Sequence, residues 1–132
     1  MKKKVLVLIP TNADKTYCIA KFLKNFRNIE MNDYVLFSDD TYKSDEYKNT
    51  IESLGYEVVK VEKTIQSLKA GYQLDIRECL VNAREALRQE FLKRKEFQYA
   101  MWFDSDIIMP KETIPQLLTW KKEKAILLNG SK

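Results

Sequence analysis

The chain has 132 residues, with 0 His, 2 Cys, 3 Gly, 3 Pro and a formal net charge of +4. This length predicts one domain, residues 1–132, and a content of 45% hydrophobic and 32% charged residues is typical of a globular protein with a real core. Without histidine, a Ser-His or Cys-His catalytic pair and a His-ligated zinc site are excluded, so any catalysis must use carboxylates, Lys, Arg, Tyr, backbone dipoles or a bound metal.

The first part of the chain predicts two strands with a helix between them. Residues 4–9 form an unbroken apolar run, which is typical of a strand covered on both faces. Asp14 or Thr16 is expected to cap the following helix, and residues 34–37 predict the second strand. The apolar residues of the helix fall on one face: Ile19, Phe22, Leu23 and Phe26.

The middle of the chain repeats this alternation. Ser44 or Asp45 is expected to open a helix that runs to Leu54, where Gly55 is well placed to end it. Residues 56–61 predict the third strand.

A polar connection around residues 70–71 leads to a long helical pattern over 74–95, and residues 97–103 then predict a buried strand. The apolar positions expected on this helix include Leu74, Leu80, Val81, Leu87, Phe91 and Leu92. A short helix over 114–121, with Pro115 in its first turn, and a last strand over 125–128 complete the pattern.

Strands that alternate with helices predict an α/β fold of three layers, α/β/α, around a mostly parallel sheet. Cys18 and Cys79 fall in helical patterns and are expected to be small buried residues. Few cysteines, and an apolar run over 5–9 that is too short for a signal peptide, predict a cytoplasmic protein. The positive charge suits acidic partners and is compatible with peripheral association with an anionic membrane, whereas no nucleic-acid-binding motif is present.

Polar residues follow three of the predicted strands. Residues 10–12 are Pro-Thr-Asn, residues 39–40 are Asp-Asp, and residues 104–106 are Asp-Ser-Asp. Because the carboxyl ends of parallel strands meet at one edge, where open α/β folds bind ligands, we expect these residues to lie together. Carboxylates there suit Mg²⁺ or Mn²⁺ carrying a phosphorylated substrate, and the alternative for the Asp pair is a solvated turn or helix cap.

Several nucleotide-binding classes do not fit these motifs. The first strand is followed by neither Gly-x-Gly-x-x-Gly nor a Walker loop, which argues against a dinucleotide-binding domain and a P-loop enzyme. A haloacid-dehalogenase-like phosphatase, a Toprim nuclease and a response-regulator receiver each require acidic residues after the first strand. This sequence has Pro-Thr-Asn there, so these three classes fit poorly. A metal-dependent nucleotidyltransferase would need a Gly-rich basic opening loop, which this sequence lacks.

The order and spacing of four segments resemble the GT-A class of nucleotide-sugar-dependent glycosyltransferases, and within it the family 2-like group. Residues 5–12 look like the opening strand with its Pro-Thr turn, and residues 35–40 look like the second strand with its terminal acids. Residues 82–87, Asn-Ala-Arg-Glu-Ala-Leu, resemble the Ala-Arg-Asn helix motif, with Glu85 where the family has Asn. Residues 99–107 are similar to the Asp-x-Asp segment. The resemblance implies a Rossmann-like GT-A fold that is C-terminally short.

The resemblance also implies roles for the nucleotide-sugar-binding residues. Those assigned to the nucleoside, the ribose and the diphosphate of a UDP- or GDP-linked sugar are Pro10, Thr11, Asn12, Asp39, Asp40, Arg84, Asp104 and Ser105. Asp104 and Asp106 would hold Mn²⁺ or Mg²⁺, which neutralises the departing nucleoside diphosphate. For Arg84, a surface ion pair is the alternative to a contact with the diphosphate.

These observations predict a metal-dependent glycosyltransferase with an unknown acceptor. In the family a further C-terminal part carries the acceptor site and the catalytic base of inverting enzymes, and this sequence ends soon after Asp106. A homo-oligomer or another partner that completes the site is therefore left open, and no catalytic base is assigned. The alternative is a non-catalytic nucleotide or nucleotide-sugar binding module, minimal or truncated.

Overall fold

The computed structural model describes residues 3–32, 34–41, 44–61 and 76–119. Within these ranges four strands form one all-parallel sheet in the order β3-β2-β1-β4. The strands are β1 (Lys3–Thr11), β2 (Val35–Asp39), β3 (Glu57–Lys60) and β4 (Phe97–Trp102). The helices are the 3₁₀ helix η1 (Ala13–Lys15), α1 (Thr16–Phe26), α2 (Glu46–Ser53), α4 (Ile76–Lys93) and α5 (Thr113–Thr119). The fold is therefore α/β and Rossmann-like, as the alternating pattern predicts.

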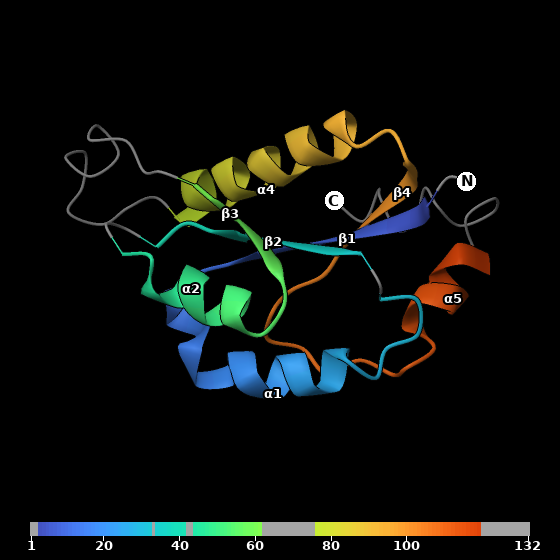
Figure 1. Ribbon diagram of the computed structural model, residues 1–132, viewed down its shortest axis with the longest axis horizontal. Coiled ribbons are helices and arrows are strands. Elements are labelled where there is room, and N and C mark those ends of the chain that lie inside the picture. The colour runs from blue at the N-terminus through green and yellow to red at the C-terminus, as the bar shows by residue number, and fades with distance from the viewer. Residues whose placement is uncertain (1–2, 33, 42–43, 62–75, 120–132) are drawn as a thin grey trace.

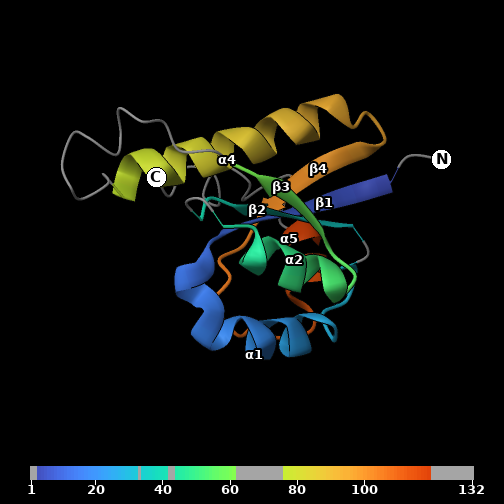
Figure 2. The ribbon, with the colours of Figure 1, turned by 60° about the vertical axis from the view of Figure 1, so that its left-hand side comes forward.

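The helices cover both faces of the sheet. In Figure 1, α4 lies above the strands, and α1 and α2 lie below them. Figure 2, turned by 60°, shows the same separation, with α4 running along one face and α1 and α2 packed under the other. The three layers predicted from the sequence are thus confirmed in the described part of the chain.

The alternation of side chains along β1 divides the core between these two faces. Val5, Val7 and Ile9 contribute to the larger cluster, which α1 and α2 cover. Leu6 and Leu8 point the other way and pack with Leu87 of α4. Both sets are apolar because helices cover both faces, and this explains the unbroken apolar run in the sequence.

The strand register brings the polar strand ends side by side. Thr11 pairs with Asp39 at the ends of β1 and β2, and Asp39 pairs in turn with Lys60 at the end of β3. Paired residues of neighbouring strands point to the same face of a sheet. These side chains therefore meet on one face of the carboxyl edge.

Helix boundaries match the sequence closely, with one correction. The prediction that Asp14 or Thr16 caps the first helix is wrong, because the chain first makes the 3₁₀ turn η1 and Asn12 caps that turn by accepting from the Asp14 amide. Lys15 holds the N-cap position of α1 without a side-chain hydrogen bond. Gly55 ends α2 with a φ of 96°, a left-handed conformation that glycine adopts without strain.

The long helix α4 is less apolar on its core side than predicted. Leu87 is fully buried, but Leu80 is 39%, Val81 63% and Leu92 45% exposed, so these three apolar positions of the helical pattern do not lie in the core. They lie on the outer side because a helix of 18 residues turns some apolar positions of a loose pattern away from the sheet. No helix in the described ranges is long and apolar enough to cross a membrane.

Four predictions fall outside the described residues. They are the connection at 70–71, the start of the long helix at 74–75, the end of the short helix at 120–121 and the last strand at 125–128.

Candidate functional site

The residues predicted to bind a ligand gather at the carboxyl edge of the sheet. Pro10 and Thr11 end β1, Asp39 ends β2, and residues 104–106 follow β4 directly. The edge has two sides, because α1 and α2 cover one face of the sheet and α4 covers the other. Some of the predicted residues lie on the α1/α2 side, where they make hydrogen bonds within the protein. Others lie on the α4 side, where they line a hollow.

On the α1/α2 side, hydroxyl groups join three segments of the chain. The Thr11 Oγ1 atom shares one hydrogen bond of 2.8 Å with the Tyr47 hydroxyl and another of 2.9 Å with Ser105 Oγ. All three residues are buried. Burial raises the pKa of Tyr47 to about 12, although the hydrogen bond with Thr11 acts in the opposite direction. The contacts fix the Asp-x-Asp segment to the end of β1 and to α2.

The carboxylate of Asp39 is also fully engaged on this side. Its Oδ1 atom accepts hydrogen bonds from the Thr41 amide (2.9 Å) and hydroxyl (2.6 Å), and its Oδ2 atom lies 3.3 Å from Lys60 Nζ. Lys60 donates further to the carbonyls of Thr41 (2.7 Å) and Ser44 (2.6 Å). Asp39 is 0% exposed, so its present contacts hold the loop after β2 against the end of β3.

The Asp-x-Asp segment crosses the edge of the sheet. Ser105 is buried against Thr11, whereas Asp104 and Asp106 on either side of it are exposed. Asp106 Oδ2 accepts a hydrogen bond of 2.9 Å from Lys15 Nζ, the last residue of η1. This contact lowers the pKa of Asp106 and raises that of Lys15, so both groups are charged at neutral pH.

On the α4 side the edge contains a hollow of about 240 Å³. It is lined by Pro10, Arg84, Trp102, Phe103, Asp104 and Ile107. The Arg84 guanidinium and the Asp104 carboxylate make no hydrogen bond or ion pair with any residue in the described ranges. Among the described residues Arg84 therefore makes no surface ion pair, which was the alternative for it. Glu85, its neighbour, points to solvent and pairs with Arg88 and Gln89.

Two buried polar groups lie on the face of the sheet that carries this hollow. Ser38 is the register partner of Pro10 and shares its face, and its Oγ atom has no hydrogen-bond partner in the described chain. The Asp40 amide donates to the Thr11 carbonyl (3.4 Å), which extends the ladder by one residue and keeps Asp40 on the face of Ser38. Asp40 is 5% exposed, and its Oδ1 atom likewise lacks a partner among the described residues. Buried polar groups of this kind are uncommon.

The Asp-x-Asp side chains suit a divalent metal by their chemistry. Asp104 and Asp106 offer exposed carboxylate oxygens, and Mg²⁺ commonly binds one or two carboxylates together with substrate phosphates. No group of three or more His, Cys, Asp or Glu residues that could hold a metal occurs in the described ranges. The two carboxylates therefore fit a metal that the phosphates of a ligand would help to hold.

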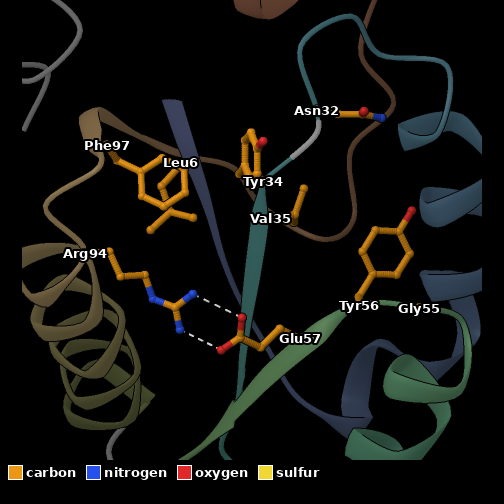
Figure 3. Close-up of a pocket in the computed structure, with 9 residues that line it drawn as sticks. All are labelled: Leu6, Asn32, Tyr34, Val35, Gly55, Tyr56, Glu57, Arg94 and Phe97. Atoms are coloured by element: carbon orange, nitrogen blue, oxygen red, sulfur yellow. Dashed lines mark hydrogen bonds and ion pairs between the residues drawn. The ribbon is translucent and has the colours of Figure 1, made fainter. Parts of the chain in front are cut away.

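A second hollow of the same volume, about 240 Å³, lies at the opposite edge of the sheet. Its charges are neutralised internally: the Arg94 guanidinium donates to both oxygens of Glu57, at 3.1 and 2.6 Å, and also to Glu90 at 3.1 Å. Figure 3 shows the guanidinium pointing at the Glu57 carboxylate, which it meets through two hydrogen bonds. Hydrogen bonding to Glu57 raises the pKa of Arg94. The hollow at the carboxyl edge differs because Arg84 and Asp104, its charged groups, have no ion-pair partner in the described part of the chain.

The structure thus brings Pro10, Arg84 and Asp104 together in one hollow and keeps Asp40 on the same face of the sheet. Thr11, Asn12, Asp39 and Ser105 make internal hydrogen bonds instead, and Cys18 lies partly buried behind Ser105, to whose carbonyl it donates (3.8 Å). The side chain of Cys79 lies outside the described part of the chain.

Sequence reasoning missed four residues of this edge: Lys15, Ser38, Lys60 and Trp102. Signals for two of them were present. Lys15 closely follows the Pro-Thr-Asn turn, and Trp102 is two residues from Asp104, so alternation along the strand would have predicted a shared face.

We compared the chain with models of protein families, with curated proteins and with solved structures, and none of these comparisons found a match.

Proposed function

We propose that this chain is a GT-A-like, family 2-like glycosyltransferase domain that binds a nucleoside-diphosphate sugar at the α4 side of the carboxyl edge and transfers the sugar to an acceptor. The observation that carries this proposal is the hollow that holds a guanidinium and a carboxylate without partners in the described chain. The same face of the sheet carries two buried polar groups that also lack described partners. A ligand with N–H donors, phosphate oxygens and an apolar ring surface would satisfy all of them.

The nucleoside would bind near the end of β2. One oxygen of the Asp40 carboxylate has no partner in the described chain and could accept from a base N–H, and the Ser38 hydroxyl on the same face can donate or accept. Trp102, which is 41% exposed and lines the hollow, offers a flat apolar face to a ring of the ligand. Asp39 would act indirectly, by holding the loop after β2 in place.

The diphosphate would bind between α4 and the Asp-x-Asp segment. Arg84 presents a guanidinium, whose fork of N–H donors matches phosphate oxygens in a bidentate geometry. Asp104 and Asp106 would hold Mn²⁺ or Mg²⁺, which when bound neutralises charge that develops on the leaving nucleoside diphosphate. Ser105, through its hydrogen bond to Thr11, keeps both carboxylates at the edge.

A non-catalytic binding module is the second candidate. It is favoured because each side chain assigned above binds or positions the ligand, and none is assigned to activate an acceptor. The two candidates share the same hollow and differ only in turnover.

Calorimetry with UDP-, GDP- and other nucleotide sugars, with and without Mn²⁺, tests the proposal. We expect Mn²⁺-dependent binding of at least one nucleotide sugar and a loss of affinity of about 100-fold in Asp104→Ala, since the substitution removes a metal ligand. Asp14→Ala is the matched control, because Asp14 is exposed at the same edge and its carboxylate makes no contact with a described residue.

Each outcome decides between the candidates. Failure of every nucleotide sugar to bind would contradict both. Binding that Asp104→Ala and Asp14→Ala weaken equally would contradict the assigned site. Binding without transfer or hydrolysis of the sugar would contradict the glycosyltransferase and support the non-catalytic binding module.

A further inference from the structure

One contact at the carboxyl edge joins a cation to the Asp-x-Asp segment. Lys15 Nζ lies 2.9 Å from Asp106 Oδ2, across 91 residues of sequence. The two side chains are 35% and 36% exposed, and an ion pair at this exposure contributes little to the stability of a fold. The position of the pair in the proposed site is therefore more informative than its strength.

The pair conflicts with metal binding at Asp106. A carboxylate oxygen that accepts a hydrogen bond from an ammonium group cannot also coordinate a divalent cation closely, because the two cations would repel each other. Metal that coordinates Asp106 through Oδ2 must therefore displace Lys15. Lys15 lies at the start of α1 on a flexible four-carbon side chain, so it can reorient without movement of the helix.

We propose that Lys15 is a phosphate-binding residue that exchanges partners. It neutralises Asp106 in the ligand-free protein, and it moves to a phosphate oxygen when a metal–nucleoside diphosphate complex takes Asp106. This inference rests on the proposed function, since it names a further residue of the same site. The exchange keeps each charge paired in both states, with one ion pair broken and two new contacts formed.

The exchange predicts effects of opposite sign in a single variant. Lys15→Met frees Asp106, so binding of Mn²⁺ alone should tighten by about 2- to 5-fold, the range expected when a competing exposed ion pair is removed. The same variant lacks a cation for the phosphates, so binding of UDP or GDP at saturating Mn²⁺ should weaken by roughly 10-fold. A loss of folding alone would weaken both.

Titration calorimetry of the full chain with Mn²⁺, and separately with UDP and GDP at saturating Mn²⁺, measures both effects. Lys21→Met is the matched control, because Lys21 is exposed on the same helix and has no contact with Asp106. Lys15→Arg should restore nucleotide binding, since it keeps the charge. We expect only Lys15→Met to shift the two affinities in opposite directions.

The inference is overturned if Mn²⁺ binds Lys15→Met no more tightly than Lys21→Met, or if it binds neither variant. It is also overturned if nucleotide affinity is the same in all variants. Failure of the proposed function looks different: the unaltered protein then binds no nucleotide sugar, while the Mn²⁺ titrations still report whether Lys15 competes for Asp106.

Discussion

The two sides of the carboxyl edge carry similar polar residues but differ in how these are satisfied. On the α1/α2 side, Asp39 has partners for both carboxylate oxygens, and Thr11 bonds two neighbouring hydroxyls. On the α4 side, Asp40 and Ser38 are equally buried yet have atoms without a hydrogen-bond partner in the described chain. Asp39 and Asp40 are neighbours in the sequence, so this difference arises only from the face to which each points.

Under the proposed function, the difference separates residues that stabilise the fold from residues that would bind a ligand. A buried polar group with its partners contributes modestly to stability, whereas one without partners costs free energy. A fold that keeps such groups on one side gives up stability there, as binding sites commonly do. Substitutions on the two sides should therefore change the free energy of unfolding in opposite directions and by different amounts.

Lys60→Met should have the largest effect on stability. It would leave the fully buried carboxylate of Asp39 without its cation, and breaking one partner of a buried pair costs about 3 kcal/mol of unfolding free energy. Urea denaturation measures this change. Lys48→Met is the control, because it breaks an exposed i,i+4 pair with Glu52 and should cost less than about 0.5 kcal/mol. Equal stability losses in both variants would show that the α1/α2 side does not depend on its buried pair.

Asp40→Leu should have the opposite sign. It removes a buried oxygen that has no partner among the described residues, so we expect the free energy of unfolding to rise by about 1 kcal/mol. At the same time the affinity for nucleotide sugars should fall by 10-fold or more, because the acceptor for the base is lost. Denaturation and calorimetry on the same preparation measure both. A variant that is destabilised by 2 kcal/mol or more would indicate that Asp40 is a structural residue like Asp39.

The sequence predicts the α/β fold well, and it also predicts that polar residues gather at the carboxyl edge of the sheet. Both predictions depend on local patterns. The apolar run of β1, the helical spacing in α1 and the glycine at the end of α2 each follow from short-range rules. The polar residues at the strand ends follow from the parallel order of the strands. These predictions require no knowledge of side-chain partners.

The division between the two sides could not be predicted in the same way. Whether Asp39 or Asp40 faces α4 depends on the exact residue at which β2 ends, and a shift of one residue exchanges the two faces. The partners of Asp39 and Asp106 lie 21 and 91 residues away and belong to other elements. Long-range ion pairs leave no periodic signal in a single sequence, so Lys60 and Lys15 were found only in the structure.

The smallest predicted effect concerns Tyr47 and depends on pH. Tyr47→Phe should lower the free energy of unfolding by about 1 kcal/mol at pH 8, because the hydrogen bond to Thr11 is lost. The pKa of Tyr47 is raised to about 12 in the folded state, above its value of about 10 when unfolded, so the folded state binds the proton more tightly. This contribution is complete below pH 10 and is lost as the pH rises toward 12.

The unaltered protein should therefore lose more stability between pH 8 and pH 11 than Tyr47→Phe does, and urea denaturation at the two pH values measures the difference. Tyr17→Phe, at a position 78% exposed, controls for the other alkaline groups and should follow the unaltered protein. If all three lose stability equally, the Tyr47 hydroxyl is not held in its protonated form by burial. The α1/α2 side would then be more open to solvent than its hydrogen bonds indicate, and the contrast with the α4 side would rest on Asp39 and Lys60 alone.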